Sequence, residues 1–426
     1  MNNNLSNEVN RCFNCVNKPC VNNCPLNNDI PTIIKLVKEN NVEEAYNILS
    51  NTTVLPLITS LVCPHEKQCK KMCTARFKGN AIEIGDVEHF LGKLAVENDW
   101  KFSTISNDLD GLNVAVVGGG PAGLTASAFL ARNGARVTIF EKQNKLGGIL
   151  RYGIPEFRLN KYILDMAINK ILEIGNGAIS VKCGIKLGES LSISELKSEF
   201  DLILLSFGAN VSKVMSIKGE ELKGVFGGNE LLENNMHPDY TDKVVVVSGG
   251  GNVAMDVART VKNLGAKKVV VVYRRSEEEM PAEIKEISEA KDEGIEFLFH
   301  TNLIAISGEN SVESVECVKT FYDGEKSREN LKNLDGSNFS LNADYVVMAI
   351  GSGTNEQLVT ELGIELDARK YIKVNDNYMT SDEKVFAVGD LIAGKATVAW
   401  AARSGRDFVE NIIKLYKRWE LWVVLH

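Results

Sequence analysis

The stretch VAVVGGGPAGLTASAFLARNGARVTIFEK, from Val114 to Lys142, decides the fold of this chain. Its four apolar residues up to Val117 predict a buried strand, and the run GGGPAG predicts a tight turn into a helix that ends near Gly134. A second apolar run, Val137 to Phe140, predicts another strand. The order indicates a βαβ unit whose turn carries the Gly-x-Gly-x-x-Gly pattern. The pattern glycines are Gly118, Gly120 and Gly123.

This βαβ unit predicts a dinucleotide site. Glycines let the backbone turn tightly and approach a pyrophosphate, while the helix N-terminus offers N–H groups and a partial positive charge. Glu141 follows Gly118 by 23 residues, a distance at which a carboxylate accepts hydrogen bonds from ribose hydroxyls. The alternative, a glycine turn that binds nothing, is disfavoured because strand, helix and acid all stand in their expected places.

Composition narrows the function classes. The chain has 426 residues, which at about 150 residues per domain suggests two to four domains. Its formal net charge of −8 argues against nucleic acid or an anionic membrane as a partner. The sequence has no apolar run of the roughly 20 residues that a membrane span needs, and its N-terminus is polar. We therefore expect a cytoplasmic protein.

The cysteines are concentrated near the N-terminus. Seven of the nine fall in two groups, RCFNCVNKPCVNNCP and VCPHEKQCKKMC, with a helix-like stretch from Pro31 to Leu49 between them. In a reducing cytosol, such a cluster favours metal or redox chemistry over disulfides. The seven are Cys12, Cys15, Cys20, Cys24, Cys63, Cys69 and Cys73.

Seven thiolates exceed the four ligands of one zinc ion and nearly supply the eight of two 4Fe–4S clusters. The missing eighth ligand would come from the segment IGDVEHF, which offers Glu88 and His89. Two 4Fe–4S clusters are the leading interpretation. A zinc site and unligated structural cysteines are the alternatives.

A second strand–turn–helix pattern follows. Lys243 to Val247 predicts a strand, and GGGNVAMD places Gly249, Gly251 and Ala254 at the three pattern positions. The next strand, Val269 to Tyr273, ends on Arg274 and Arg275 where the first unit has an acid. Arginines bind a ribose 2′-phosphate that an acid would repel, so this site should prefer NADP(H), with NAD(H) as the alternative. A solvated arginine pair facing the next three glutamates is the competing interpretation.

The chain then returns to the first domain. Residues 301–343 predict β-hairpins, and the strand Val385 to Val388 ends on Gly389 and Asp390. Asp390 can bind a polyol hydroxyl, and a helix that begins near Thr397 can direct its N-terminal dipole at a flavin ring. We expect an α/β fold with two nested Rossmann-like domains after an all-α domain. The predicted domains are 1–108, helical with two clusters; 109–234 with 340–426, binding FAD; and 235–339, binding NAD(P)H.

These motifs resemble a known family. It comprises the glutamate synthase small (beta) subunit, the flavin subunit of NAD-dependent dihydropyrimidine dehydrogenase and the N-terminal parts of the eukaryotic dihydropyrimidine dehydrogenases. The resemblance covers roughly residues 11 to 411. It is carried by RCFNCVNKPCVNNCP, VCPHEKQC, AIEIGDVEHF, GGILRYGIPEFRL, GGGNVAMD, YRRSEEEMPA and VFAVGD.

The resemblance implies a helical domain like an alpha-helical ferredoxin. One cluster would be bound by Cys12, Cys15, Cys20 and Cys73, and the other by Cys24, Cys63, Cys69 and Glu88. The implied FAD contacts are Gly118, Gly120, Pro121, Ala122, Gly123, Glu141, Lys142, Gly148, Ile149, Arg158, Gly389, Asp390, Thr397 and Val398. The implied nucleotide contacts are Gly250, Gly251, Asn252, Val253, Arg274 and Arg275.

The function that follows is an electron-input subunit, in which NADPH reduces FAD and electrons leave through two 4Fe–4S clusters to a partner. The catalytic centre is the flavin, and no side chain has to act as acid or base. The partner would be a glutamate synthase large subunit, a dihydropyrimidine dehydrogenase-like chain or ferredoxin, in a hetero-oligomer or homodimer. A ferredoxin:NADP oxidoreductase subunit, a thioredoxin reductase-like enzyme and a non-catalytic redox sensor are the alternatives. Against the reductase, Cys183 and Cys317 lie outside any Cys-x-x-Cys motif.

Overall fold

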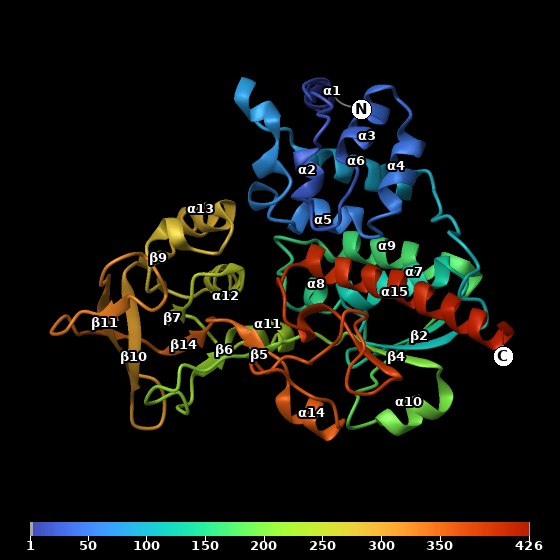
Figure 1. Ribbon diagram of the computed structural model, residues 1–426. Coiled ribbons are helices and arrows are strands. Elements are labelled where there is room, and N and C mark those ends of the chain that lie inside the picture. The colour runs from blue at the N-terminus through green and yellow to red at the C-terminus, as the bar shows by residue number, and fades with distance from the viewer. Residues whose placement is uncertain (1–2, 426) are drawn as a thin grey trace. The chain divides into compact units, whose positions relative to one another are not determined.

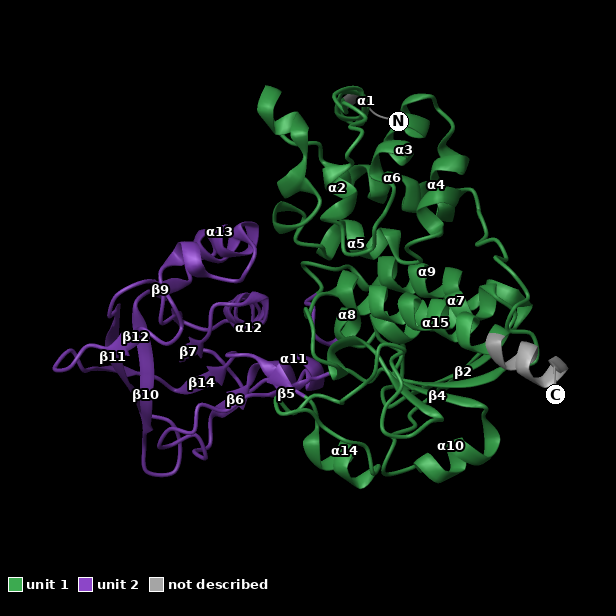
Figure 2. Cartoon of the chain, viewed as in Figure 1, with its two compact units in different colours: residues 1–151, 156–208, 354–426 green, residues 152–155, 209–353 purple. Residues whose placement is uncertain are grey.

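The computed structural model describes residues 3–425, with side chains from residue 4 to residue 417. The chain forms two compact units (Figure 2). The first comprises Met1–Arg151, Glu156–Gly208 and Thr354–His426, and the second comprises Tyr152–Pro155 and Ala209–Gly353. The chain therefore leaves the first unit and returns to it. The three domains and their boundaries, as expected from the sequence, stay a prediction.

The first unit begins with a helical part (Figure 1). Buried apolar residues of α1, α3, α4 and α6 form one core, and α5, whose Leu57, Ile58 and Val62 are buried, packs against α6. The elements are α1 Asn3–Asn10, α2 Pro19–Asn22, α3 Ile30–Lys38, α4 Val42–Ser50, α5 Pro56–Val62, η1 His65–Lys67, η2 Lys70–Met72, η3 Thr74–Lys78 and α6 Ile84–Glu97.

The single helix-like stretch that the sequence suggested from Pro31 to Leu49 is wrong in one respect, because two helices occupy it. Helix α3 ends at Lys38 and α4 begins at Val42. Between them Asn40 adopts a left-handed backbone with φ of 59°, a conformation that asparagine tolerates better than most residues. The two consecutive asparagines after Glu39 were the signal for this break.

A five-stranded parallel sheet forms the centre of the first unit, in the order β16-β4-β1-β2-β3. The helices α7, α9 and α15 lie on one side of it and α10 and α14 on the other (Figure 1). Helix α8, Ile149–Tyr152, follows β2. The bounds are β1 Asn113–Val117, α7 Pro121–Arg132, β2 Arg136–Glu141, α9 Lys161–Leu172, β3 Ile179–Cys183, α10 Ile193–Glu199, β4 Leu202–Leu205, α14 Glu356–Glu361, β16 Val385–Ala387 and α15 Val398–Leu425.

The second unit repeats this architecture. Its parallel sheet has the order β6-β14-β7-β8-β9, and an antiparallel group, β10 to β13, confirms the predicted hairpins. The bounds are β5 Val211–Ser212, β6 Val225–Gly227, α11 Gly228–Asn234, β7 Val244–Ser248, α12 Asn252–Asn263, β8 Lys268–Val272, α13 Ile284–Asp292, β9 Glu296–Leu298, β10 Thr301–Ser307, β11 Ser314–Tyr322, β12 Leu331–Asn333, β13 Phe339–Asn342, β14 Tyr345–Met348 and β15 Ser352–Gly353.

Both sheets place a glycine-rich turn at the same topological position. Strand β1 lies between β2 and β4, and β7 lies between β8 and β14. At such a point successive connections diverge, which leaves a crevice at the carboxyl end of the strand where dinucleotides bind. This confirms the two predicted Rossmann-like domains. Among the described helices, none combines the length and apolar character that a membrane span requires.

Candidate cofactor and cluster sites

The first glycine-rich turn, between β1 and α7, has a conformation that needs glycine. Gly118 has φ of +111°, and a Cβ on Gly123 would overlap the carbonyl oxygen of Gly118. The buried Glu141 carboxylate holds the turn from β2, because its Oε2 accepts the Gly119 N–H at 2.8 Å. Glu141 thus holds the glycine-rich turn in shape, a role in addition to the predicted ribose contact.

The start of α7 is left open for a ligand. Its N-cap residue is Gly120, and no side chain caps it, whereas Asn160 and Ser192 cap α9 and α10. A Cβ on Gly120 would have only the Gly148 Cα near it, at 3.8 Å. Uncapped N–H groups beside free space form an anion site, as a pyrophosphate requires.

The end of the chain completes this edge of the sheet. Gly389 lies after β16, where its N–H donates to Ser404 Oγ of α15 at 2.9 Å, and Asp390 follows it. Burial raises the pKa of Asp390 to about 6. Helix α15 begins at Val398, as expected, and Thr397 Oγ1 accepts the Trp400 N–H at 3.3 Å. The parts of Lys142, Ile149 and Arg158 in binding stay predictions.

The second glycine-rich turn, between β7 and α12, has the same form. Gly249 has φ of +145°, and the N-cap Gly251 carries no side-chain cap. Asn252 is used locally, because its Oδ1 accepts the Glu283 N–H at 2.9 Å and so holds the next loop to the start of α12. The first turns of α12 are therefore fixed for a phosphate while their N–H groups stay open.

Arg274 and Arg275 follow β8. Within the described part of the chain, no carboxylate lies at ion-pair distance from either guanidinium, although three glutamates follow them in sequence. Glu277 pairs instead with Lys291 at 2.6 Å, and Glu279 accepts the Tyr322 hydroxyl. Burial and the neighbouring Arg275 and Arg328 lower the pKa of Arg274, which indicates a local excess of positive charge. Such a pair suits a 2′-phosphate.

Two cavities lie in the helical part. The first is lined by Cys24, Cys63, Cys69 and Glu88, and the second by Cys12, Cys15, Cys20 and Cys73. These are the two ligand sets that the family resemblance implied. His89, the alternative eighth ligand, lies outside both linings, and its Nδ1 lies 3.2 Å from Ser60 Oγ.

The donor chemistry fits two clusters. All seven cysteines are free thiols, and burial raises the pKa of Cys20 to about 12. Glu88 is buried, with a pKa that burial raises to about 7 although the Thr59 hydroxyl, 2.6 Å from Oε1, acts to lower it. Among the described residues, no three His, Cys, Asp or Glu side chains converge as on a single ion. Donors spread around a space suit a cubane, whose ligands each bind a different iron.

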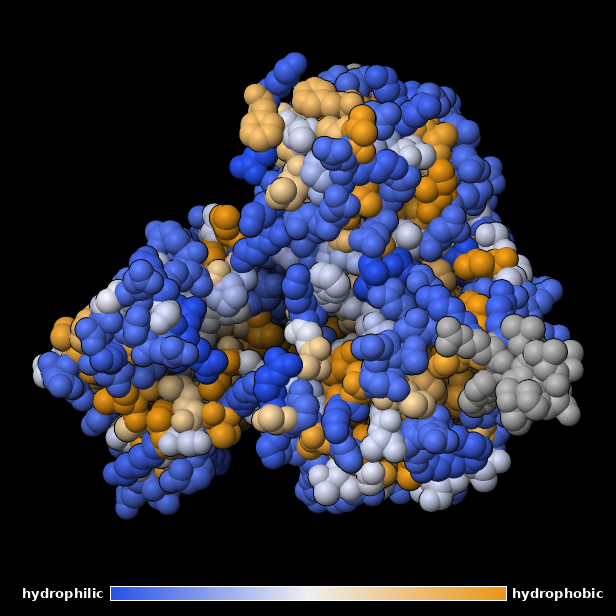
Figure 3. Space-filling model, viewed as in Figure 1, coloured by the Kyte–Doolittle hydropathy of each residue, from blue (hydrophilic) through white to orange (hydrophobic). Residues whose placement is uncertain are grey.

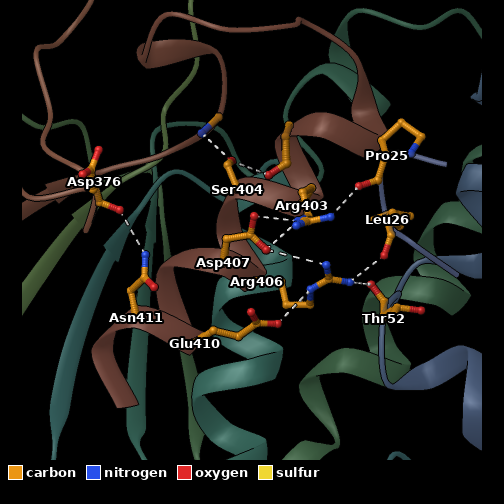
Figure 4. A network of polar contacts seen from close by, with 12 residues as sticks. Pro25, Leu26, Thr52, Asp376, Arg403, Ser404, Arg406, Asp407, Glu410 and Asn411 are labelled. Atoms are coloured by element: carbon orange, nitrogen blue, oxygen red, sulfur yellow. Dashed lines mark hydrogen bonds and ion pairs between the residues drawn. The ribbon is translucent and has the colours of Figure 1, made fainter. Parts of the chain in front are cut away.

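Helix α15 holds the loop that carries Cys24 (Figure 4). Arg406 is 5% exposed and donates from one nitrogen to Leu26 O at 2.8 Å and to Thr52 O at 2.9 Å. Arg403 donates to Pro25 O at 3.1 Å. Helix α15 therefore binds the backbone immediately after Cys24, a predicted cluster ligand.

Three residues of these sites were not predicted from the sequence. His65 lines the first cavity with Nδ1 3.5 Å from Cys69 Sγ, and its place two residues after Cys63 was the available signal. Arg403 and Arg406 gave no signal, because their partners lie more than 350 positions away.

The chain is similar in sequence to two known families and to several named proteins. Residues 112–415 match the family described as pyridine nucleotide-disulphide oxidoreductase, and residues 1–100 match dihydropyrimidine dehydrogenase domain II, 4Fe-4S cluster. A glutamate synthase [NADPH] small chain of Halomonas elongata is 33% identical, covering 95% of this chain and 89% of that protein. The NAD-dependent dihydropyrimidine dehydrogenase subunit PreT of Salmonella typhimurium is 31% identical, covering 95% and 92%.

Solved structures share the fold. FprA from Mycobacterium tuberculosis superposes with a TM-score of 0.64 at 19% identity, over 73% of this chain and 86% of that one. Thioredoxin reductase of T. acidophilum gives 0.52 at 21% identity, over 71% and 97%.

Proposed function

Because this chain belongs to the pyridine nucleotide-disulphide oxidoreductase family, we propose that it is the electron-input subunit of a two-component, glutamate synthase-like oxidoreductase. It is an oxidoreductase with FAD, NAD(P) and 4Fe–4S domains, as the two family matches indicate. When bound, the flavin accepts a hydride from NADPH and releases electrons singly to iron–sulfur clusters. That there are two clusters is part of the proposal, and so is a cytoplasmic location, which would keep the thiols reduced.

One observation carries the proposal. The cavity lined by Cys24, Cys63, Cys69 and Glu88 is also lined by Ala399, in the first turn of α15. That helix begins shortly after Asp390, a proposed FAD contact. The N-terminal end of α15 therefore borders both the cavity with the proposed cluster donors and the proposed flavin site. This supports a direct path between them, and the first cavity would hold the cluster nearer the flavin.

The chain's own residues would position the two dinucleotides and select NADPH over NADH. The open N-termini of α7 and α12 would bind the phosphates of the two dinucleotides, and Glu141 keeps the first turn in shape. Arg274 and Arg275 favour NADPH over NADH, which supports a partner like the glutamate synthase large subunit. A dihydropyrimidine dehydrogenase-like partner is the second candidate, supported by the similarity to PreT. In the described structure, Cys183 is exposed and Cys317 is buried, so neither supports a dithiol reductase.

Anaerobic titration of the purified protein with NADPH tests the function. We expect about eight irons per chain and bleaching of flavin and cluster absorbance. A protein that lacks iron, or that NADPH does not bleach, contradicts the proposal. Replacing Arg274 and Arg275 by alanine should raise KM for NADPH roughly 30-fold or more with a small dye acceptor, because charge-assisted bonds to the 2′-phosphate are lost. KM for NADH should stay constant, and Lys267→Ala, at an exposed lysine, is the matched control.

A further inference from the structure

Four exposed apolar side chains belong to the two segments, residues 12–16 and 72–77, that supply much of the lining of the second cavity. They are defined here as the exit patch: Phe13, Val16, Met72 and Phe77. Val16 is 96% exposed and Phe77 is 82% exposed, which is unusual for large apolar residues in a folded domain. Their immediate sequence neighbours include proposed ligands of the second cluster, Cys12, Cys15 and Cys73.

Contacts hold together the two segments that carry these residues. Phe13 lines the second cavity together with Cys12, Cys15 and Cys73. The Lys78 ammonium lies 5.5 Å above the Phe13 ring, and Cys15 Sγ lies 2.9 Å from Thr74 Oγ1, so the 12–16 loop lies against η3. Figure 3 shows tan and orange side chains gathered at this upper edge of the helical part. The two segments that carry the exit patch therefore lie side by side, next to the second cavity.

The rim of the exit patch is basic. Between Lys67 and Lys78 the sequence has five cationic residues and no carboxylate, in a chain of net charge −8. Lys71, Arg76 and Lys78 are exposed, and among the described residues no carboxylate lies at ion-pair distance from any of the three. Lys70 pairs with Glu66 and Glu83 at 2.6 Å, so Lys71, Arg76 and Lys78 carry the charge that remains on the rim. An apolar centre beside these three cations fits a surface of opposite charge.

We propose that the exit patch docks the electron-accepting partner, a protein with its own redox centre and with an apolar surface rimmed by carboxylates. The inference rests on the proposed function, because it requires a cluster in the second cavity from which electrons leave the chain. Phe13 of the exit patch lines that cavity. In each transfer the partner's centre gains one electron, which NADPH oxidation supplies, and no bond is made or broken. A second copy of this chain would bring basic rim against basic rim, which disfavours it as the occupant.

The test uses the whole protein, reduced with dithionite and freed of it by gel filtration. The probe acceptor is the acidic soluble domain of cytochrome b5, followed by stopped-flow absorbance. We expect the rate constant to fall with rising ionic strength. The triple variant K71E/R76E/K78E should lower it about tenfold or more at low salt and flatten the salt dependence. With basic cytochrome c as acceptor, the same variant should raise the rate.

A second variant, V16S/F77S, should lower the rate with cytochrome b5 severalfold without altering its salt dependence. The matched controls are K223E/K267E/K414E, with the same change in net charge, and V214S/M236S, at exposed apolar positions. All variants should keep wild-type iron content and reduce dichlorophenolindophenol with NADPH at the wild-type rate.

Three outcomes would overturn the proposal. One is an unchanged rate with cytochrome b5 in the triple variant. The second is a wild-type protein that is dimeric in solution and a V16S/F77S variant that is monomeric with an unchanged rate. This result would make the exit patch an interface between two copies of the chain. The third is binding to vesicles of phosphatidylcholine and phosphatidylserine that the variants abolish while the rate stays constant. Failure of NADPH to reduce the dye would instead contradict the proposed function, because dithionite loading bypasses that step.

Discussion

Replacing Arg406 by methionine should loosen the helical part from α15. Methionine keeps much of the side-chain volume and removes the charge and all donors. The carbonyl oxygens of Leu26 and Thr52 then lose their hydrogen bonds at 2.8 and 2.9 Å. The acids beside Arg406 are less affected, because Asp407 keeps its contact with Arg403 at 2.6 Å and the Glu410 side chain is 56% exposed.

The magnitude follows from these two bonds. A hydrogen bond from a charged donor contributes about 1.5–3 kcal/mol, so two contribute roughly 3–6 kcal/mol. Water that reaches the carbonyls recovers part of this, which leaves about 3 kcal/mol. Because each 1.4 kcal/mol is about a factor of ten, local opening of the contact should become about 100-fold more frequent.

Amide hydrogen exchange followed by mass spectrometry measures this opening locally. A local measurement is needed because a chain with several domains has no single free energy of unfolding. Exchange of the amides in α5 and in the 26–28 loop should accelerate about 100-fold, while α12 in the second unit stays unchanged. Arg403→Met is the control. It removes one carbonyl contact to the helical part, at 3.1 Å, together with the Asp407 ion pair inside α15, and by the same arithmetic it should cost the contact about 1.5 kcal/mol.

The reasoning would be refuted if Arg406→Met changed exchange in α5 by less than about threefold, or if Arg403→Met had the same effect as Arg406→Met. Either result would mean that apolar packing of Ala399 and Ala402 on Leu26 and Cys63 holds the helical part without the guanidinium.

Two further predictions concern the nucleotide domains. Gly123→Ala should abolish FAD retention, because the added Cβ overlaps a carbonyl oxygen of the phosphate turn, whereas Gly394→Ala, in open space, should retain wild-type flavin absorbance. Asp344 is partly buried, which favours the neutral acid, but the Val244 N–H and the Lys243 ammonium, at 2.8 and 3.0 Å, hold its pKa below the usual value. The ionised Asp344 therefore stabilises the folded state above its unfolded pKa near 4, and this stabilisation is lost as pH falls through the folded pKa. Asp344→Asn should flatten the acid side of the plot of melting temperature against pH. An unchanged slope contradicts this prediction.

Local chemistry explains how much of the fold was predictable. Glycines at Gly118 and Gly249 are needed for backbone angles that few other residues adopt, so the two turns and their flanking strands were evident from short segments. The break between α3 and α4 was missed, since a periodic apolar pattern outweighed two asparagines. Glu141 was predicted to contact a ribose, and the structure adds its bond to Gly119 N–H, which depends on the register of β1 with β2.

The sequence by itself determined the two dinucleotide folds, the cysteine-rich N-terminus and the arginine pair, because residue type and spacing specify turns, strands and ligand chemistry. The family resemblance already implied the two sets of four donors. Only the tertiary structure showed that each set lines one cavity, which helix end borders the first cavity and which cations lack a carboxylate. Those features join Cys24 to Glu88 and Arg406 to Leu26 across loops whose path depends on packing of the whole core. A contact between residues hundreds of positions apart leaves no local pattern, and therefore only the folded chain reveals it.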